Sequence, residues 1–305
     1  MFILRIIWYT YLIFHYKGGK YMATKKAASA AKKSSAKQST AKKQTTTKVT
    51  TVKAVESRPA MQAASTTNRS VRFSLSRTPL VAALIAEFIG TFIFAATIIA
   101  GQGQPILVFF ALVGVVLAVG TLSGAYVNPA LTIGAWLTKR MSGVRALAYI
   151  VAQVLGAMLA LVMLNMYVHA APAASANDIY SSGAAELFKA ASIPAGKEWL
   201  IFFSEFVGTA IFGFAVAGAV REKKERTAAA LTVGLGVFLG LMVAGSAAAF
   251  VGGSAILNPA VAVALQAINF TSVWPLAVYV LGSVLGGVIG FVLYDMLRGA
   301  EKETA

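Results

Sequence analysis

Apolar side chains dominate residues 80–298 in long runs that are separated by short polar stretches. Six of these runs hold about 20 residues each, which is the length that an α-helix needs to cross the ~30 Å hydrocarbon core of a bilayer. The pattern therefore predicts six membrane-spanning helices. They are expected approximately at Leu80–Ala100, Pro105–Leu122, Val144–Val168, Trp199–Val220, Ala228–Phe250 and Pro275–Leu297.

Two further apolar runs are too short to cross a bilayer, and each begins with Asn-Pro-Ala. Asn is a favoured helix N-cap and Pro suits the first helical position, so each motif predicts a helix start. One such motif is explained by an ordinary helix N-terminus, but two copies in matching halves favour a pair of re-entrant half-helices. The predicted central constriction comprises Asn128, Pro129, Ala130, Asn258, Pro259 and Ala260.

The two halves of the apolar region repeat each other. Ala86–Thr91 in the first predicted span matches Ser204–Thr209 in the fourth, and an Asn-Pro-Ala motif follows each. Three spans separate equivalent points, so the second half is expected upside down relative to the first, with the half-helix N-termini meeting near the midplane. There the helix dipoles repel cations, while the two Asn side chains donate hydrogen bonds to neutral solutes.

Glu87 and Glu205 are the two carboxylates in the middle of predicted spans. A carboxylate in the membrane is either a transport site or a structural acceptor. Their symmetric placement favours the structural role, in which each accepts hydrogen bonds from the backbone of a re-entrant loop.

The basic charge lies outside this region. The formal net charge is +16, and residues 1–79 hold 16 of the 27 Lys and Arg residues with a single acid, Glu56. Residues 22–79 are rich in Ala, Lys, Ser and Thr, a composition that predicts a disordered tail. Such a tail either sets membrane topology or attracts anionic lipid or nucleic acid.

The first 21 residues have a different composition from the tail. Lys17–Lys20 reads Lys-Gly-Gly-Lys, which purine-rich codons resembling a bacterial ribosome-binding site would encode. We therefore expect translation to start at Met22 and residues 1–21 to be an untranslated or non-conserved extension. Residues 299–305 are expected to form a short C-terminal tail.

Loop charges predict the orientation, because cytoplasmic loops are enriched in Lys and Arg. Lys139, Arg140 and Arg145 lie between spans two and three, and residues 221–226 carry four basic residues between spans four and five. The loop at 101–104 has no charge. The sequence therefore predicts a multi-pass protein of the plasma membrane with both termini in the cytoplasm.

The motifs together resemble the major intrinsic protein family, the aquaporins and glycerol channels. The resemblance rests on AEFIGT, SGAYVNPALT, YIVAQVLGA, SEFVGT, ILNPA and LGSVLGGVIGFVLYD within residues 80–298. It implies an all-α, right-handed bundle of six helices and two half-helices, with repeats at about 80–168 and 199–298 and one pore in each protomer of a homotetramer. It also implies that carbonyls of Gly124–Tyr126 and Gly253–Ala255 line the pore and that Glu87 and Glu205 brace the loops.

The sequence departs from the family pattern after the second Asn-Pro-Ala. Val261 stands where the family usually has Arg, and Ala262 stands where glycerol channels commonly have Asp. The predicted outer filter is therefore wide and apolar, unless an aromatic ring enters it. Its members are Val108, Ser246, Ala255 and Val261, and the candidate aromatic residues are Phe109, Phe110 and Phe250.

Three functions fit these features. The favoured one is a passive channel for water and small neutral solutes such as glycerol or urea. The alternatives are a coupled secondary transporter, for which only the two Glu residues offer an ion site, and a membrane anchor that acts through its basic tail. The chain has no Cys and two His, His15 and His169, and no metal, cofactor or enzymatic activity is expected.

Overall fold

The computed structural model describes residues 79–170, 186–222, 225–269 and 272–304. The predictions for the extension at 1–21 and for nearly all of the tail at 22–79 lie outside the described residues. Within these ranges the regular structure is entirely helical, and six helices are long and apolar enough to cross a membrane.

The six predicted spans are confirmed, with ends that differ by a few residues. They are α2 (Pro79–Ala100), α3 (Pro105–Ser123), α5 (Gly143–Ala170), α6 (Glu198–Ala219), α7 (Arg226–Ala249) and a last span that ends in α10 (Ser283–Thr304). This last span opens with α9 (Trp274–Leu276) and a π-helical turn, η2 (Ala277–Gly282). The α10 helix continues through residues that the sequence assigned to a C-terminal tail.

The two predicted half-helices are α4 (Pro129–Leu137) and α8 (Pro259–Ala264). With nine and six residues they extend about 14 and 9 Å at 1.5 Å per residue, well short of a bilayer. Each half-helix packs against the last long helix of the other repeat, because α4 contacts α10 and α8 contacts α5. The halves are therefore interlocked at the half-helices.

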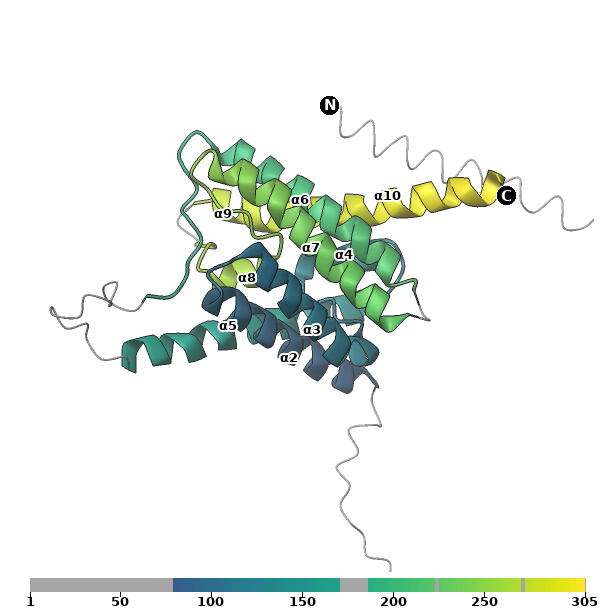
Figure 1. Ribbon diagram of the computed structural model, residues 1–305, viewed down its shortest axis with the longest axis horizontal. Coiled ribbons are helices and arrows are strands. Elements are labelled where there is room, and N and C mark those ends of the chain that lie inside the picture. The colour runs from purple at the N-terminus through teal and green to yellow at the C-terminus, as the bar shows by residue number, and fades with distance from the viewer. Residues whose placement is uncertain (1–78, 171–185, 223–224, 270–271, 305) are drawn as a thin grey trace, which may run out of the picture. The chain divides into compact units, whose positions relative to one another are not determined.

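Within each repeat the first helix lies between the other two. The α2 helix contacts α3 and α5, and α6 contacts α7 and α10 (Figure 1). Glycines permit these close approaches. A Cβ at Gly156 of α5 would collide with the carbonyl of Phe88, and one at Gly286 of α10 would collide with the carbonyl of Phe206. The same small-residue packing that brings membrane helices together thus occurs at equivalent places in both repeats.

The outer face of α2 is apolar. Val81, Ile85, Ile89 and Ile93 recur every four residues and are each about 40% exposed. Residues four apart share one side of a helix, so these side chains form a continuous stripe. Such a stripe suits contact with lipid tails.

Candidate functional site: two half-helices that meet

Each half-helix begins at an asparagine cap. Asn128 and Asn258 have extended backbones, and their Oδ1 atoms accept hydrogen bonds from Ala130 N at 2.9 Å and Ala260 N at 3.0 Å. The prolines that follow occupy the first helical position, where the missing N–H costs nothing. The local sequence therefore accounts for both helix starts.

The same two asparagines join the loops to each other. Asn128 Nδ2 donates to the carbonyl of Leu257 at 2.8 Å, and Asn258 Nδ2 donates to the carbonyl of Val127 at 2.9 Å. Both side chains are almost fully buried. An amide carries two N–H groups, so each of these hydrogen bonds leaves a second donor on the same nitrogen. The reciprocal bonds bring the positive ends of both half-helix dipoles to one place.

The carbonyls that accept these bonds belong to residues with unusual backbone angles. Val127 and Leu257 have φ values of 40° and 61°, in the left-handed region that non-glycine residues rarely adopt. For the β-branched Val127 this conformation is strained, and strain of this kind concentrates at functional sites. Here the left-handed backbone directs the carbonyls of Val127 and Leu257 towards the asparagine of the opposite loop.

Glu87 of α2 holds the first loop. Its Oε1 accepts a hydrogen bond from Tyr126 N at 3.0 Å, and its Oε2 accepts bonds from Val127 N and Gln153 Nε2, both at 2.7 Å. The Glu87 side chain is completely buried. The carboxylate thus supplies acceptors for backbone N–H groups of a loop that belongs to no helix or sheet. In a membrane interior such groups must be paired within the protein.

Glu205 of α6 stands in the same relation to the second loop. Its carboxylate accepts bonds from the backbone N–H groups of Ile256 and Leu257, the latter at 2.9 Å, and from Ser283 Oγ at 2.8 Å. The two carboxylates therefore make equivalent contacts with the two re-entrant loops.

Sequence reasoning missed the third partner of each carboxylate. Gln153 lies in α5 and Ser283 at the start of α10, at matching places in the YIVAQVLGA and YVLGSVLGG segments. Gln153 also donates to Thr132 Oγ1 at 2.9 Å, and Thr132 Oγ1 donates to the Asn128 carbonyl at the same distance. Aligning the two segments would have marked Gln153 and Ser283 as a polar pair within apolar sequence.

The residues predicted for the central constriction lie together and are buried. Pro129 and Ala130 open α4, and Pro259 and Ala260 open α8. The four residues predicted for the outer filter differ in their burial. Val108 and Val261 belong to one buried apolar cluster, and Ala255 packs partly buried against it.

The fourth filter residue, Ser246, is exposed. It shares a face of α7 with Leu239, Met242 and Val243, which are exposed large apolar side chains, so it lies apart from the buried cluster. Of the aromatic candidates, Phe250 is 89% exposed and Phe109 lies edge-on to both Phe110 and Phe238. The composition of the outer filter stays a prediction.

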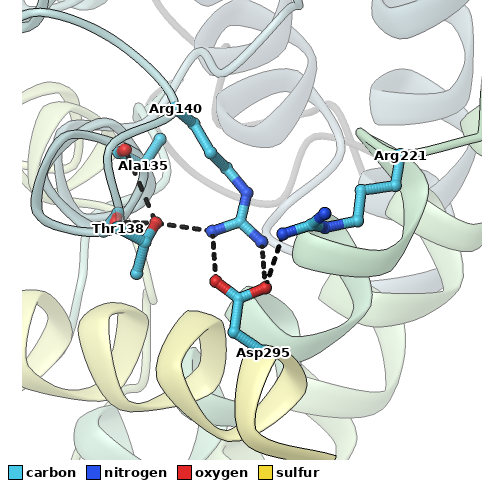
Figure 2. A network of polar contacts seen from close by, with 6 residues as sticks. Ala135, Thr138, Arg140, Arg221 and Asp295 are labelled. Carbon is cyan, nitrogen blue, oxygen red and sulfur yellow. Dashed lines mark hydrogen bonds and ion pairs between the residues drawn. The ribbon is translucent and has the colours of Figure 1, made fainter. Parts of the chain in front are cut away.

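A charged network lies at the end of the bundle where α4 terminates (Figure 2). Arg140 forms two hydrogen bonds with Asp295 of α10, at 2.9 and 3.1 Å, and Arg221 approaches the same carboxylate at 2.8 Å. Arg140 also donates to Thr138 Oγ1 and stacks on Phe291, 4.8 Å from the ring centre. The network ties the ends of α4 and α6 to α10, and we call this end of the bundle the basic end.

Comparison with known proteins agrees with this geometry. A family model described as major intrinsic protein matches residues 74–294, and the chain belongs to this family. It is 30% identical over 240 residues to Aquaporin NIP1-1 of Zea mays, which covers 73% of this chain and 77% of that protein. It is also 30% identical over 198 residues to Aquaporin AqpM of Methanothermobacter marburgensis, covering 62% of this chain and 73% of that one.

A solved structure shares the fold. The aquaglyceroporin from Plasmodium falciparum superposes with a TM-score of 0.55 and 20% identity, and the match covers 74% of this chain and all of the other.

Proposed function

We propose that this protein is a passive transmembrane channel for water and small neutral solutes. The observation that carries the proposal is the reciprocal pair of hydrogen bonds from Asn128 to Leu257 and from Asn258 to Val127. They hold two half-helix N-termini against each other in the interior of a six-helix membrane bundle. Such an arrangement repels cations through the helix dipoles and still offers amide donors to uncharged polar molecules.

The proposed outer filter is wide and apolar. Val261 and Val108 offer no charge and no hydrogen-bond donor from their side chains, so selection at this level rests on diameter. We therefore propose passage of solutes bulkier than water, with glycerol and urea as representatives.

Coupled transport fits less well, because both intramembrane carboxylates are already engaged. Glu87 and Glu205 each accept two backbone hydrogen bonds and one side-chain bond. A carboxylate that takes up a proton during transport would have to give up these acceptor interactions in every cycle. Transport without chemistry or coupling is accordingly the favoured function, rather than catalysis or a pump.

Orientation and assembly are part of the proposal. The basic end faces the cytoplasm, since cytoplasmic loops are enriched in Arg and Lys, and it contains Arg140, Arg145, Arg221 and Arg226. Both termini then lie in the cytoplasm of a plasma-membrane protein. The channel assembles as a homotetramer in the lipid bilayer, and the tail at 22–79 either sets membrane topology or contacts anionic lipid or nucleic acid.

The test is osmotic swelling or shrinkage of proteoliposomes, followed by stopped-flow light scattering with water, urea and glycerol gradients. The proposed channel conducts water and at least one of the two solutes, and an imposed proton gradient leaves the rates unchanged. Rates equal to those of protein-free liposomes for all three would overturn the channel function. Deletion of residues 22–79 should leave these rates intact.

A further inference from the structure

A second polar feature lies between α3 and α7 at the basic end. It is a cavity of about 190 Å³, bounded by α3, α7 and the end of α6, with room for several water molecules. Most of its wall is apolar. Its polar side chains are those of Thr121, Glu222 and Arg226.

The cavity reaches the start of the first re-entrant loop. Gly124, which lines it, is the C-cap of α3 and has a left-handed backbone with a φ of 96°. Four residues later the chain reaches Asn128, the cap of α4. Gly124 is also one of the residues whose carbonyls are expected to line the pore, so the cavity lies beside the expected solute path.

Arg226 connects the two helices that flank the cavity. It is the first residue of α7, and one of its terminal nitrogens donates to the carbonyl of Leu117 in α3 at 2.8 Å. Arg226 is an exposed residue that also lines the cavity. The contact is made across 109 positions of sequence, so it is a feature of the tertiary structure.

The position of Arg226 is electrostatically unusual. A cation on the first residue of a helix meets the positive end of the helix dipole, which is unfavourable. Leu117, however, lies in the last two turns of α3, whose carbonyl end favours a cation. The side chain thus bonds to the negative end of the neighbouring helix, beside the cavity.

We propose that Arg226 is the solute-selecting residue at the basic end of the channel. The proposal rests on the proposed channel function and adds a second point of selection to it. The guanidinium donors and the Thr121 hydroxyl accommodate small uncharged molecules that both donate and accept hydrogen bonds, such as urea or a polyol. The length of the Arg226 side chain sets the upper size of the solute that passes.

The predicted outer filter, with the buried Val261, has no charged side chain. The basic end has a positively charged side chain that bridges two helices. Arg226 therefore adds a second point of selection, at the inner end of the proposed passage.

The experiment compares wild-type protein with Arg226→Ala in proteoliposomes, using water, urea and glycerol gradients. Removing the side chain should raise the ratio of glycerol to water permeability about fivefold, which corresponds to about 1 kcal/mol of barrier at ~1.36 kcal/mol per tenfold change in rate. Arg226→Lys, which keeps length and charge, should stay near the wild-type ratio. Arg221→Ala is the matched control, because it removes an arginine from the same loop that does not line the cavity.

The outcomes separate the two proposals. A wild-type protein that conducts none of the three molecules refutes the channel function itself. A conducting wild type whose ratio is unchanged in Arg226→Ala overturns the role of Arg226, and so does an equal rise in Arg221→Ala, which would point to the loop as a whole. If Arg226→Ala does not insert, Arg226→Ser carries the same test, since Ser is tolerated at helix N-termini.

Discussion

The side chain of Asn258 donates a hydrogen bond to the carbonyl of Val127, 131 positions earlier in the chain, at 2.9 Å. The same side chain accepts the bond that caps α8. One residue therefore both starts its own half-helix and fastens the opposite loop, and Asn128 does the same in reverse. Loss of either asparagine removes two different kinds of contact.

Two substitutions at Asn258 separate these contacts. Asn258→Ala removes the cap and the bridge and should lower stability by about 2 kcal/mol, at ~1 kcal/mol for the cap and ~1 kcal/mol for the hydrogen bond. Asn258→Asp keeps an acceptor for the cap but cannot donate to Val127. Thermal unfolding in detergent should rank wild type, Asp and Ala in this order, and solute flux should fall in both variants. An Ala variant with wild-type stability and flux would refute the site.

At position 87 an amide side chain should lower the stability less than a hydrocarbon side chain does. Glu87→Gln keeps one oxygen that accepts from the loop backbone, whereas Glu87→Leu leaves the N–H groups of Tyr126 and Val127 unpaired at about 1–3 kcal/mol each. Unfolding midpoints in detergent should therefore fall much further for Leu than for Gln. Equal tolerance of both substitutions would show that the loop does not depend on this carboxylate.

Glycines at the close helix approaches should resist substitution. A Cβ at Gly156 would collide with the carbonyl of Phe88, so Gly156→Ala should destabilise the protein by about 1–3 kcal/mol through overpacking. Gly286→Ala should act in the same way. Gly114→Ala is the control, because nothing lies within 4 Å of its added Cβ, and it should be neutral or gain up to ~1 kcal/mol from higher helix propensity. Equal effects at Gly156 and Gly114 would contradict the packing described.

The arginines that share Asp295 should contribute unequally. The Arg140 side chain is 10% exposed and that of Arg221 is 41% exposed. Arg221→Ala should therefore cost less than about 1 kcal/mol, as exposed ion pairs do. Arg140→Ala should cost more, roughly 1–3 kcal/mol, because a charged hydrogen-bond network is broken in a nearly buried place. Chemical unfolding of the two variants measures the difference, and a larger loss for Arg221→Ala would be the contrary result.

Val261→Arg tests the apolar outer filter. An arginine in the pore mouth narrows it and donates hydrogen bonds, so glycerol and urea flux should fall much more than water flux. Val261→Leu is the control for side-chain size without charge. Because Val261 is 1% exposed, unfolding of both variants should be recorded beside the stopped-flow rates. A wild type that passes water but excludes urea and glycerol would contradict the wide filter.

Hydrophobic length and repetition were sufficient to predict the architecture. Spans are recognisable because a bilayer requires about 20 apolar residues, and the half-helices are recognisable because their apolar runs are too short and begin with Asn-Pro. The expectation that the two halves are related by inversion followed from the odd number of spans, three, between the matching stretches Ala86–Thr91 and Ser204–Thr209. Span length, the Asn-Pro motifs and the number of spans can all be read from a single sequence.

Long-range side-chain partners were not predictable in the same way. The apolar sequence around Gln153 does not indicate that its amide donates to Glu87, 66 positions earlier. The pairing of Arg140 with Asp295 spans 155 positions. The left-handed backbone at Val127 was also unforeseen, since a β-branched residue gives no local signal for it and the surrounding contacts impose it. The π-helical turn in the last span was missed for the same reason.

The packing of α4 against α10 has a consequence for biogenesis. The α4 helix ends at Leu137 and α10 begins at Ser283, about 150 residues later in the chain. At synthesis rates of ~5–20 residues per second, the first half-helix waits roughly 7–30 s for the surface on which it packs. During that interval its short, non-spanning backbone has to be kept from lipid by the translocation machinery or by neighbouring helices. Ribosomes that stall between these two segments should therefore leave α4 accessible to water-soluble labelling reagents, and completion of the chain should protect it.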